Sequence, residues 1–190
     1  LLVVSDEIYA KLTYDGEHTC FASLPGMKDR TILLNGFSKA YAMTGWRLGY
    51  AMANADFIAA MNKIHQYTML CAPVTAQAAA LTALRECHED VRNMVAEYDQ
   101  RRKIMLEGFR SMGLRCFEPK GAFYIFPSIR ELGITSTDFA EKLLMTEKVA
   151  LVPGGAFGES GEGFVRCSYA SSMEKLQIAL ERIGRFVAGL

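Results

Sequence analysis

The sequence predicts an α/β protein in which a mixed sheet with helices is followed by a smaller α+β domain. Three observations support this prediction. Apolar runs of the length of buried strands occur at residues 1–4, 31–34 and 48–53. Helical apolar periodicity then fills residues 54–112. Beyond Gly113 short strand and helix patterns alternate, which is typical of a compact α+β domain. We therefore expect one domain at residues 1–112 and a second at residues 113–190.

The composition is that of an ordinary globular protein. The chain has 190 residues, of which 51% are hydrophobic and 22% charged, and its formal net charge is +0. Without a basic run it lacks the electrostatic pattern of a nucleic-acid or acidic-membrane binder. No apolar run approaches the roughly 20 residues that span a bilayer. The five cysteines are scattered, and neither they nor the three histidines show metal-ligand spacing. We expect a cytoplasmic protein with reduced cysteines, no metal and a small-molecule partner.

The first three strands are expected to form one sheet. The uninterrupted apolar run at residues 1–4 is interpreted as a fully buried parallel strand, with residues 31–34 as its neighbour. Residues 48–53 follow too closely for a helical crossover, so we expect this third strand to be antiparallel to the second. The sheet is therefore predicted to be mixed.

Three helices are expected next. Asn54 and Asp56 provide the chemistry of an N-cap for a helix to about Leu70, whose apolar face comprises Phe57, Ala60, Met61 and Ile64. Pro73 suits the first turn of a second helix that ends near Glu86. The third helix is predicted over residues 89–112, and its basic segment at residues 101–103 is interpreted as a solvated face.

The second domain is predicted to contain four short strands and two helices. The strands are expected at residues 114–117, 122–126, 149–152 and 164–169. One helix is expected to open at residues 136–138 and run to about Glu147. Ser172 is expected to cap the last helix, whose apolar residues lie along one stripe.

A lysine and an arginine lie eight residues apart in a glycine-punctuated loop after the second strand. Lys39 follows the end of that strand, and in open α/β sheets ligands bind beyond the carboxyl ends of strands. A lysine amine in such a crevice can form an imine with an aldehyde. Arg47 adds a permanent planar charge suited to a phosphate. The alternative is that Lys39 is a solvated surface lysine.

Asp6 follows the first strand, and therefore lies at another carboxyl strand end. Alone, it could equally be the N-cap of a helix. Glu7 and His18 are acid–base candidates without a partner in a recognisable pattern, so both are interpreted as exposed loop residues. Arg166 is a charge within an otherwise apolar strand, and burying an unpaired guanidinium is costly. It is expected either to meet an anion, including a structural salt-bridge partner, or to lie at an edge.

The pattern S-K-x-x-x-x-T-G-x-R-x-G from Ser38 to Gly49 resembles the lysine region of class I/II aminotransferases of fold type I, which use pyridoxal 5'-phosphate (PLP). The resemblance implies that Lys39 bonds to the cofactor's aldehyde and that Arg47 binds its phosphate. Gly36 stands where many members have a hydroxyl residue that contacts the phosphate, which leaves Ser38 as a partial candidate for that contact.

The same resemblance implies roles for three further residues. Asp6 is expected to face the pyridine nitrogen as a buried carboxylate, which would stabilise the protonated ring. Tyr9 is expected to reach the 3'-oxygen through its hydroxyl. Residues 119–124, 152–154 and 164–166 resemble small-domain motifs of this family, in which the arginine equivalent to Arg166 holds the substrate's α-carboxylate.

The resemblance covers essentially the whole chain, as the carboxyl-terminal part of a longer enzyme. Residues 1–112 are then the end of the PLP-binding large domain with its connecting helix, and residues 113–190 the small domain. The implied activity is transfer of an amino group between an L-amino acid, with aspartate favoured, and a 2-oxo acid by a homodimer. The chain opens without methionine inside an apolar run, so we expect a fragment that is inactive alone. A PLP-dependent carbon–sulfur lyase and the ligand-sensing domain of a transcription regulator are the alternatives.

Overall fold

The computed structural model describes residues 1–190, which divide by internal packing into two compact units. The first unit comprises Leu1–Val95 and the second comprises Ala96–Leu190. The division falls inside the helix α3 (His88–Ser111). The domain boundary predicted after residue 112 lies at the end of this helix and stays a prediction. No helix combines the length and the apolar character that crossing a membrane requires.

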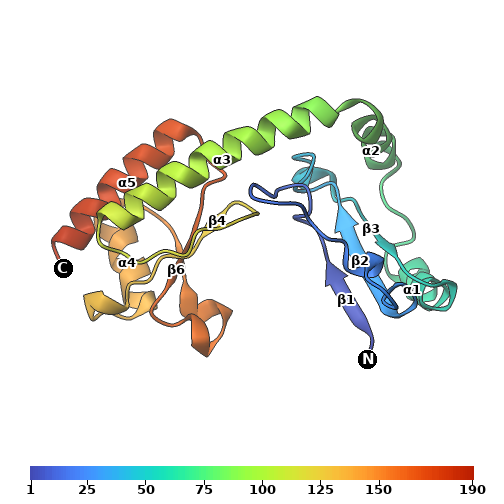
Figure 1. The fold of residues 1–190 in the computed structure, drawn as a ribbon, viewed down its shortest axis with the longest axis horizontal. Coiled ribbons are helices and arrows are strands. Elements are labelled where there is room, and N and C mark those ends of the chain that lie inside the picture. The colour runs from blue at the N-terminus through green and yellow to red at the C-terminus, as the bar shows by residue number, and fades with distance from the viewer. The chain divides into compact units, whose positions relative to one another are not determined.

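The first unit is built on a three-stranded mixed sheet in the order β1-β2-β3 (Figure 1). Its strands are β1 (Val3–Asp6), β2 (Thr31–Gly36) and β3 (Gly49–Met52). β1 pairs with β2 in parallel and β3 pairs with β2 antiparallel, which confirms the predicted mixed sheet. The prediction that the first strand is fully buried is wrong for this chain. Burial alternates along β1, and Val4 is 64% exposed, because only one face of the strand is covered.

Two helices of the first unit begin where the sequence predicts. α1 (Ala55–Thr68) is capped by Asn54, whose side chain accepts a hydrogen bond from the Phe57 amide at 3.1 Å. α2 (Val74–Glu86) follows Pro73 and buries three alanines, Ala76, Ala80 and Ala83. α1 buries no residue at all, so its predicted apolar face is uncovered. Three single-turn 3₁₀ helices complete this unit, at Phe21–Ser23, Lys28–Arg30 and Thr44–Trp46.

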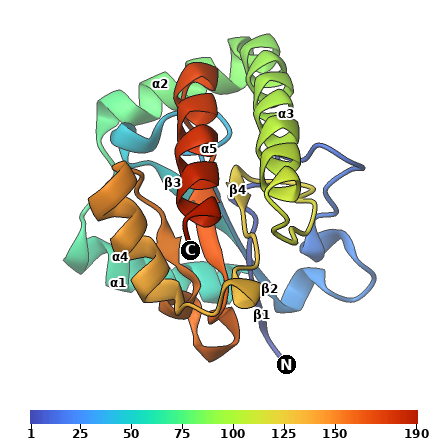
Figure 2. The same cartoon turned by 90° about the vertical axis from the view of Figure 1, so that its left-hand side faces the viewer.

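The second unit has an antiparallel sheet in the order β4-β6-β5, with helices α4 and α5 lying side by side (Figure 2). Its elements are β4 (Tyr124–Ile125), α4 (Ser136–Glu147), β5 (Val152–Pro153), β6 (Val165–Ser168) and α5 (Met173–Ala188), with 3₁₀ turns at Arg130–Leu132, Gly154–Phe157 and Glu159–Gly161. Thr135 and Ser172 cap the two helices through their hydroxyls. The strand predicted at residues 114–117 is reduced to one bridge, between Cys116 and Pro127.

One charged residue lies in the core of the second unit. Arg102 is 2% exposed, so the prediction that residues 101–103 form a solvated face is wrong at this position. Its guanidinium contacts Asp99 at 2.7 Å and Glu118 at 3.3 Å, and it donates to the Pro119 carbonyl at 2.9 Å. These partners compensate the burial of the charge. They also tie α3 to the segment that precedes β4.

Candidate active site

Three segments that carry predicted site residues leave the first sheet at the same edge. Asp6 ends β1 and Gly36 ends β2, and these two strands are parallel. Gly49 begins β3 and pairs with Gly36, because β3 is antiparallel to β2. The sheet therefore brings the segments that bear Asp6, Lys39 and Arg47 to the edge where open α/β sheets bind ligands. The strand topology thus brings together three segments that are separate in the sequence.

The turn that carries Lys39 is anchored on both sides of the lysine. The Phe37 carbonyl accepts hydrogen bonds from the amides of Tyr41 at 3.2 Å and Met43 at 3.3 Å. Phe37 and Met43 are buried in an apolar cluster with alanines of α2, and Ala40 is buried as well. Lys39 itself is half-buried. The fold thus holds the backbone of the turn fixed and leaves the lysine partly accessible.

Arg47 is held in a left-handed backbone conformation, with φ 55° and ψ 48°. Ala42 in the same loop also has a positive φ, of 52°. Such residues cost of order 1–3 kcal/mol each and persist where the surrounding structure imposes them. The Arg47 guanidinium donates to the Thr44 carbonyl at 2.8 Å, and the side chain is exposed. It borders a hollow of about 480 Å³ that is also lined by Ala42, Gly45, Trp46, Pro73, Thr75 and Ala76.

Gly36 lies where the second and third strands approach most closely. A Cβ at this position would come within 3.0 Å of both the Gly49 Cα and the Leu48 carbonyl, and within 3.2 Å of Ile8 Cδ1. These separations are shorter than ordinary van der Waals contacts. A side chain at residue 36 would therefore be tightly packed in this structure, and the hydroxyl nearest in sequence to Lys39 is that of Ser38, which is half-buried.

Asp6 does not meet the prediction of a buried carboxylate. Its side chain is exposed, and its Oδ1 accepts a hydrogen bond from the Ile8 amide at 3.1 Å, which closes a local turn after β1. Asp6 points to the open face because the side chains of a strand alternate. Tyr9 follows this turn and is half-buried, and its carbonyl accepts from the amide of the fully buried Leu12 at 2.8 Å.

The prediction that Glu7 and His18 are exposed loop residues is wrong for Glu7. Glu7 is 5% exposed, and its carboxylate contacts His18 Nε2 at 2.7 Å. It also accepts from the Phe21 amide at 2.9 Å and from Ser5 Oγ at 3.1 Å. Burial by itself raises the pKa of Glu7, but these hydrogen bonds outweigh burial and hold the pKa below its ordinary value. The carboxylate therefore ties residues 18–21 to the end of β1.

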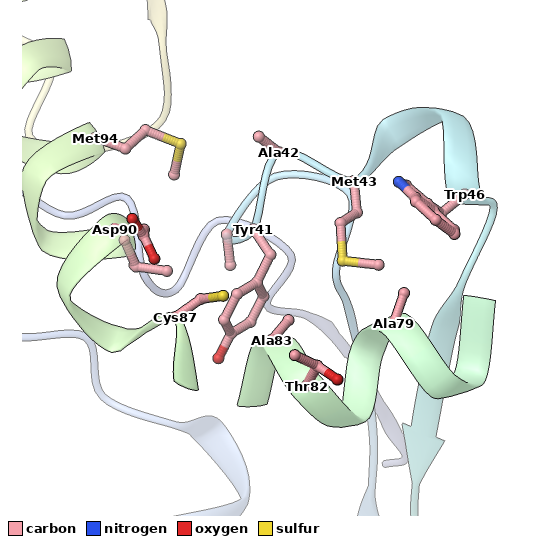
Figure 3. A pocket seen from close by; sticks show the side chains of 12 residues that line it. Tyr41, Ala42, Met43, Trp46, Ala79, Thr82, Ala83, Cys87, Asp90 and Met94 are labelled. Carbon is pink, nitrogen blue, oxygen red and sulfur yellow. The ribbon is translucent and has the colours of Figure 1, made fainter. Parts of the chain in front are cut away.

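An apolar cavity of about 560 Å³ borders the turn that follows Lys39, since Tyr41, Ala42 and Met43 are among its lining residues (Figure 3). Side chains from three segments line it, namely the loop after β2, α2 and the first turns of α3, and they include Tyr41, Met43, Trp46, Ala79, Thr82, Cys87 and Met94. Burial and the neighbouring Asp90 raise the pKa of the Cys87 thiol. The thiol is therefore kept protonated, and the cavity contains no activated nucleophile.

Arg166 lies in the second unit, on the central strand of its sheet. The residue is half-buried, and its guanidinium carbon lies 4.5 Å from the centroid of the Tyr124 ring and 4.4 Å from that of Phe157. The guanidinium forms no salt bridge and no hydrogen bond within the chain. Arg166 therefore has no structural salt-bridge partner in this structure. It does not lie on an edge strand either, because β6 is the central strand of its sheet. No group of three or more potential metal ligands occurs in residues 1–190.

Comparison with known proteins supplies independent information. The family model described as aminotransferase class I and II matches residues 1–183. A putative aminotransferase of Bacillus subtilis is 57% identical over 98% of the chain, and an aspartate aminotransferase of Pyrococcus abyssi is 50% identical over 96%. The alignments cover 48% of each of these proteins. The chain therefore spans about half the length of the curated relatives it matches.

A solved structure agrees with the chain over its full length. The crystal structure of the aromatic aminotransferase from Pyrococcus horikoshii superimposes with a TM-score of 0.97 at 48% identity. The superposition covers 100% of this chain and 51% of that chain. This agreement confirms the predicted fold class.

Proposed function

The chain belongs to the class I and II aminotransferase family, and from this premise we propose that it is the carboxyl-terminal half of a PLP-dependent enzyme. In the proposed reaction an amino group moves between an L-amino acid and a 2-oxo acid. The observation that carries the proposal is the convergence of the segments bearing Asp6, Lys39 and Arg47 at one edge of the first sheet. Each segment brings one of the chemical groups that PLP requires.

The side chains at this edge fit the functional groups of PLP. The cofactor presents an aldehyde, a phosphate, a pyridine nitrogen and a phenolic oxygen. Lys39 would hold the aldehyde, and Arg47 is suited to the phosphate by its planar, permanently charged guanidinium. Asp6 is a carboxylate for the protonated nitrogen, and Tyr9 is a hydroxyl donor for the phenolic oxygen. Ser38 is a further candidate for the phosphate.

The residues of this chain would position the reacting groups and move one proton. When bound, PLP supplies an electron sink for the carbanion that forms at the substrate's α-carbon. Once the substrate's amine has displaced it, the Lys39 amine would take the proton from that carbon as a general base and would deliver it, as a general acid, to the carbon that bore the cofactor's aldehyde. Asp6 would keep the pyridine nitrogen protonated. Arg47 would fix the phosphate end, and the anchored turn would keep the Lys39 backbone in place during the reaction.

Arg166 is proposed to bind the α-carboxylate of the substrate. A guanidinium without an ion pair in the chain has donors left for an anion, and a carboxylate accepts two of them in parallel. L-aspartate is the favoured amino donor, since several relatives are named aspartate aminotransferases. Aromatic amino acids are the second choice, because one relative is named an aromatic-amino-acid aminotransferase.

The test is a transamination assay on the full-length protein with PLP, L-aspartate and 2-oxoglutarate. Lys39→Ala should lower turnover at least about 10³-fold, within the range for loss of a general acid–base group. Lys63→Ala is the matched control, because Lys63 is an exposed lysine of α1. Turnover by the Lys39→Ala variant close to that of the control would refute the proposal.

A further inference from the structure

We infer that Tyr124 and Phe157 form an aromatic clamp that positions the Arg166 guanidinium for a substrate carboxylate. The inference rests on the proposed function and adds two positioning residues to it. Its basis is the contact of Arg166 with both rings, at 4.5 Å and 4.4 Å from their centroids. Both distances are well inside the roughly 6 Å over which a cation is attracted to a ring face.

The two rings reach Arg166 from the two neighbouring strands. Tyr124 belongs to β4, and Phe157 lies in the turn directly after β5. The strand of Arg166, β6, lies between β4 and β5. Arg166 itself pairs with Val152 of β5. The long side chain is thus restricted by a ring from each neighbour, while the N–H groups of the guanidinium have no partner in the chain.

The turn that carries Phe157 is built to hold one shape. The Gly154 amide donates to the Phe164 carbonyl at 2.8 Å, and the Phe164 amide donates to the Gly161 carbonyl at 3.2 Å. Gly154 and Gly161 lie so close that a Cβ on either would overlap the carbonyl oxygen of the other. Any side chain at these two positions would force the turn, and with it Phe157, to move.

A carboxylate fastens the same turn to α4. Glu162 accepts hydrogen bonds from the Ser136 amide at 2.7 Å and from the Ser136 hydroxyl at 2.6 Å. The Gly155 amide donates to the Ser136 oxygen at 3.3 Å, and Ser136 is fully buried. The hydrogen bonds from Ser136 lower the pKa of Glu162, so this anchor is ionised at neutral pH.

Phe157 also packs against a further aromatic ring. Phe126 meets Phe157 edge to face with 6.1 Å between centroids, and it stacks on Phe164 at 5.3 Å. Arg130 in turn lies over the Phe164 ring at 4.7 Å. Phe157 is 48% exposed and Arg166 is only half-buried, so the ring contacts the guanidinium without closing access to it. A fixed ring and an accessible cation are the properties that a preorganised carboxylate site requires.

The first experiment separates positioning from general structure in the full-length protein. Phe157→Leu should raise the KM for L-aspartate about 2- to 30-fold, the range that corresponds to loss of one cation–π contact, with little change in kcat. Single-turnover reaction with butylamine, which has no carboxylate, should be unchanged. Phe157→Tyr should restore the wild-type KM. Phe117→Leu is the matched control, because Phe117 is 82% exposed in the same unit.

The outcomes distinguish the clamp from the proposed function. Equal losses for L-aspartate and butylamine, or no loss for either, would overturn the clamp while the Lys39-dependent activity of the wild type stands. Absence of any wild-type transamination would overturn the proposed function and the carboxylate role together.

A second readout does not depend on catalysis. In the ¹⁵N-arginine NMR spectrum of the full-length protein, the Arg166 Hε signal should carry a ring-current shift that Phe157→Leu reduces and Phe117→Leu does not. An Arg166 signal that is identical in both variants would overturn the clamp.

Discussion

Adding a methyl group at Gly36 should destabilise the protein, because the new group would be too close to the neighbouring backbone. In the structure a Cβ at this position comes within 3.0 Å of the Gly49 Cα and the Leu48 carbonyl, which are backbone atoms that cannot rotate away. β2 and β3 would have to separate at the edge from which Lys39 and Arg47 emerge. Overpacking of this kind typically costs about 1–3 kcal/mol, so Gly36→Ala should lower the free energy of unfolding by about that amount.

Gly45→Ala is the control for this prediction. A Cβ on Gly45 would meet no atom within 4 Å, and the residue has no positive φ, so the variant should be neutral or gain up to about 1 kcal/mol. Urea titration followed by tryptophan fluorescence measures both variants, since Trp46 is the single tryptophan and lies in the first unit. Gly36→Ser adds the hydroxyl that many family members have, but its Cβ would make the same close contacts as that of alanine. We therefore expect Gly36→Ser to weaken PLP binding. Equal stability of Gly36→Ala and Gly45→Ala would refute the packing argument.

Three more outcomes are expected. The free energy of unfolding should fall as the pH drops below 4.5, the ordinary pKa of the Glu7 carboxyl. The folded state lowers the pKa of Glu7, so the ionised carboxylate stabilises the fold and this stabilisation is lost on protonation. Glu7→Gln should flatten this pH dependence in acid titrations followed by Trp46 fluorescence. Arg102→Met should cost about 3 kcal/mol in urea unfolding followed by circular dichroism, the low end for breaking a buried pair, because its partners keep some solvent. The control Lys103→Met, at a side chain 64% exposed, should cost less than about 1 kcal/mol, and equal losses would contradict the assignment. The chain alone should show no turnover with PLP, L-aspartate and 2-oxoglutarate, and turnover comparable to an intact aminotransferase would contradict this.

The sheet and the helices of the first unit were predictable because their signals are local. Apolar run length and the short connection before residue 49 suffice for a parallel pair followed by an antiparallel strand. The side chains of β1 alternate between a covered and an open face, and this alternation continues beyond the strand. Val3 and Ser5 face inward, and the same period of two places Glu7 inside and Asp6 outside. The burial of Glu7 was therefore predictable from the alternation of side chains, whereas its hydrogen-bond partners were not.

The partners of buried charges were not predictable because they come from irregular segments. His18 lies 11 residues beyond Glu7, across a stretch with no regular structure before the first 3₁₀ turn. Arg102 is buried by Glu118 and the Pro119 carbonyl, which follow the end of its helix. The aromatic contacts of Arg166 likewise join residues that are 42 and 9 positions apart in the sequence, since they depend on how the three short strands pair. The apolar periodicity of α1 likewise predicted a helix correctly but did not predict burial, because none of its residues is buried.

The most direct test of the account is to locate the lysine that bonds to the cofactor. The full-length protein is loaded with PLP, reduced with borohydride, digested and mapped by mass spectrometry. We expect the label on Lys39, where the segments bearing Asp6 and Arg47 also leave the sheet, and we expect Lys39→Ala to abolish it. A label on another lysine, or no reducible bond in the wild-type protein, would contradict the central claim.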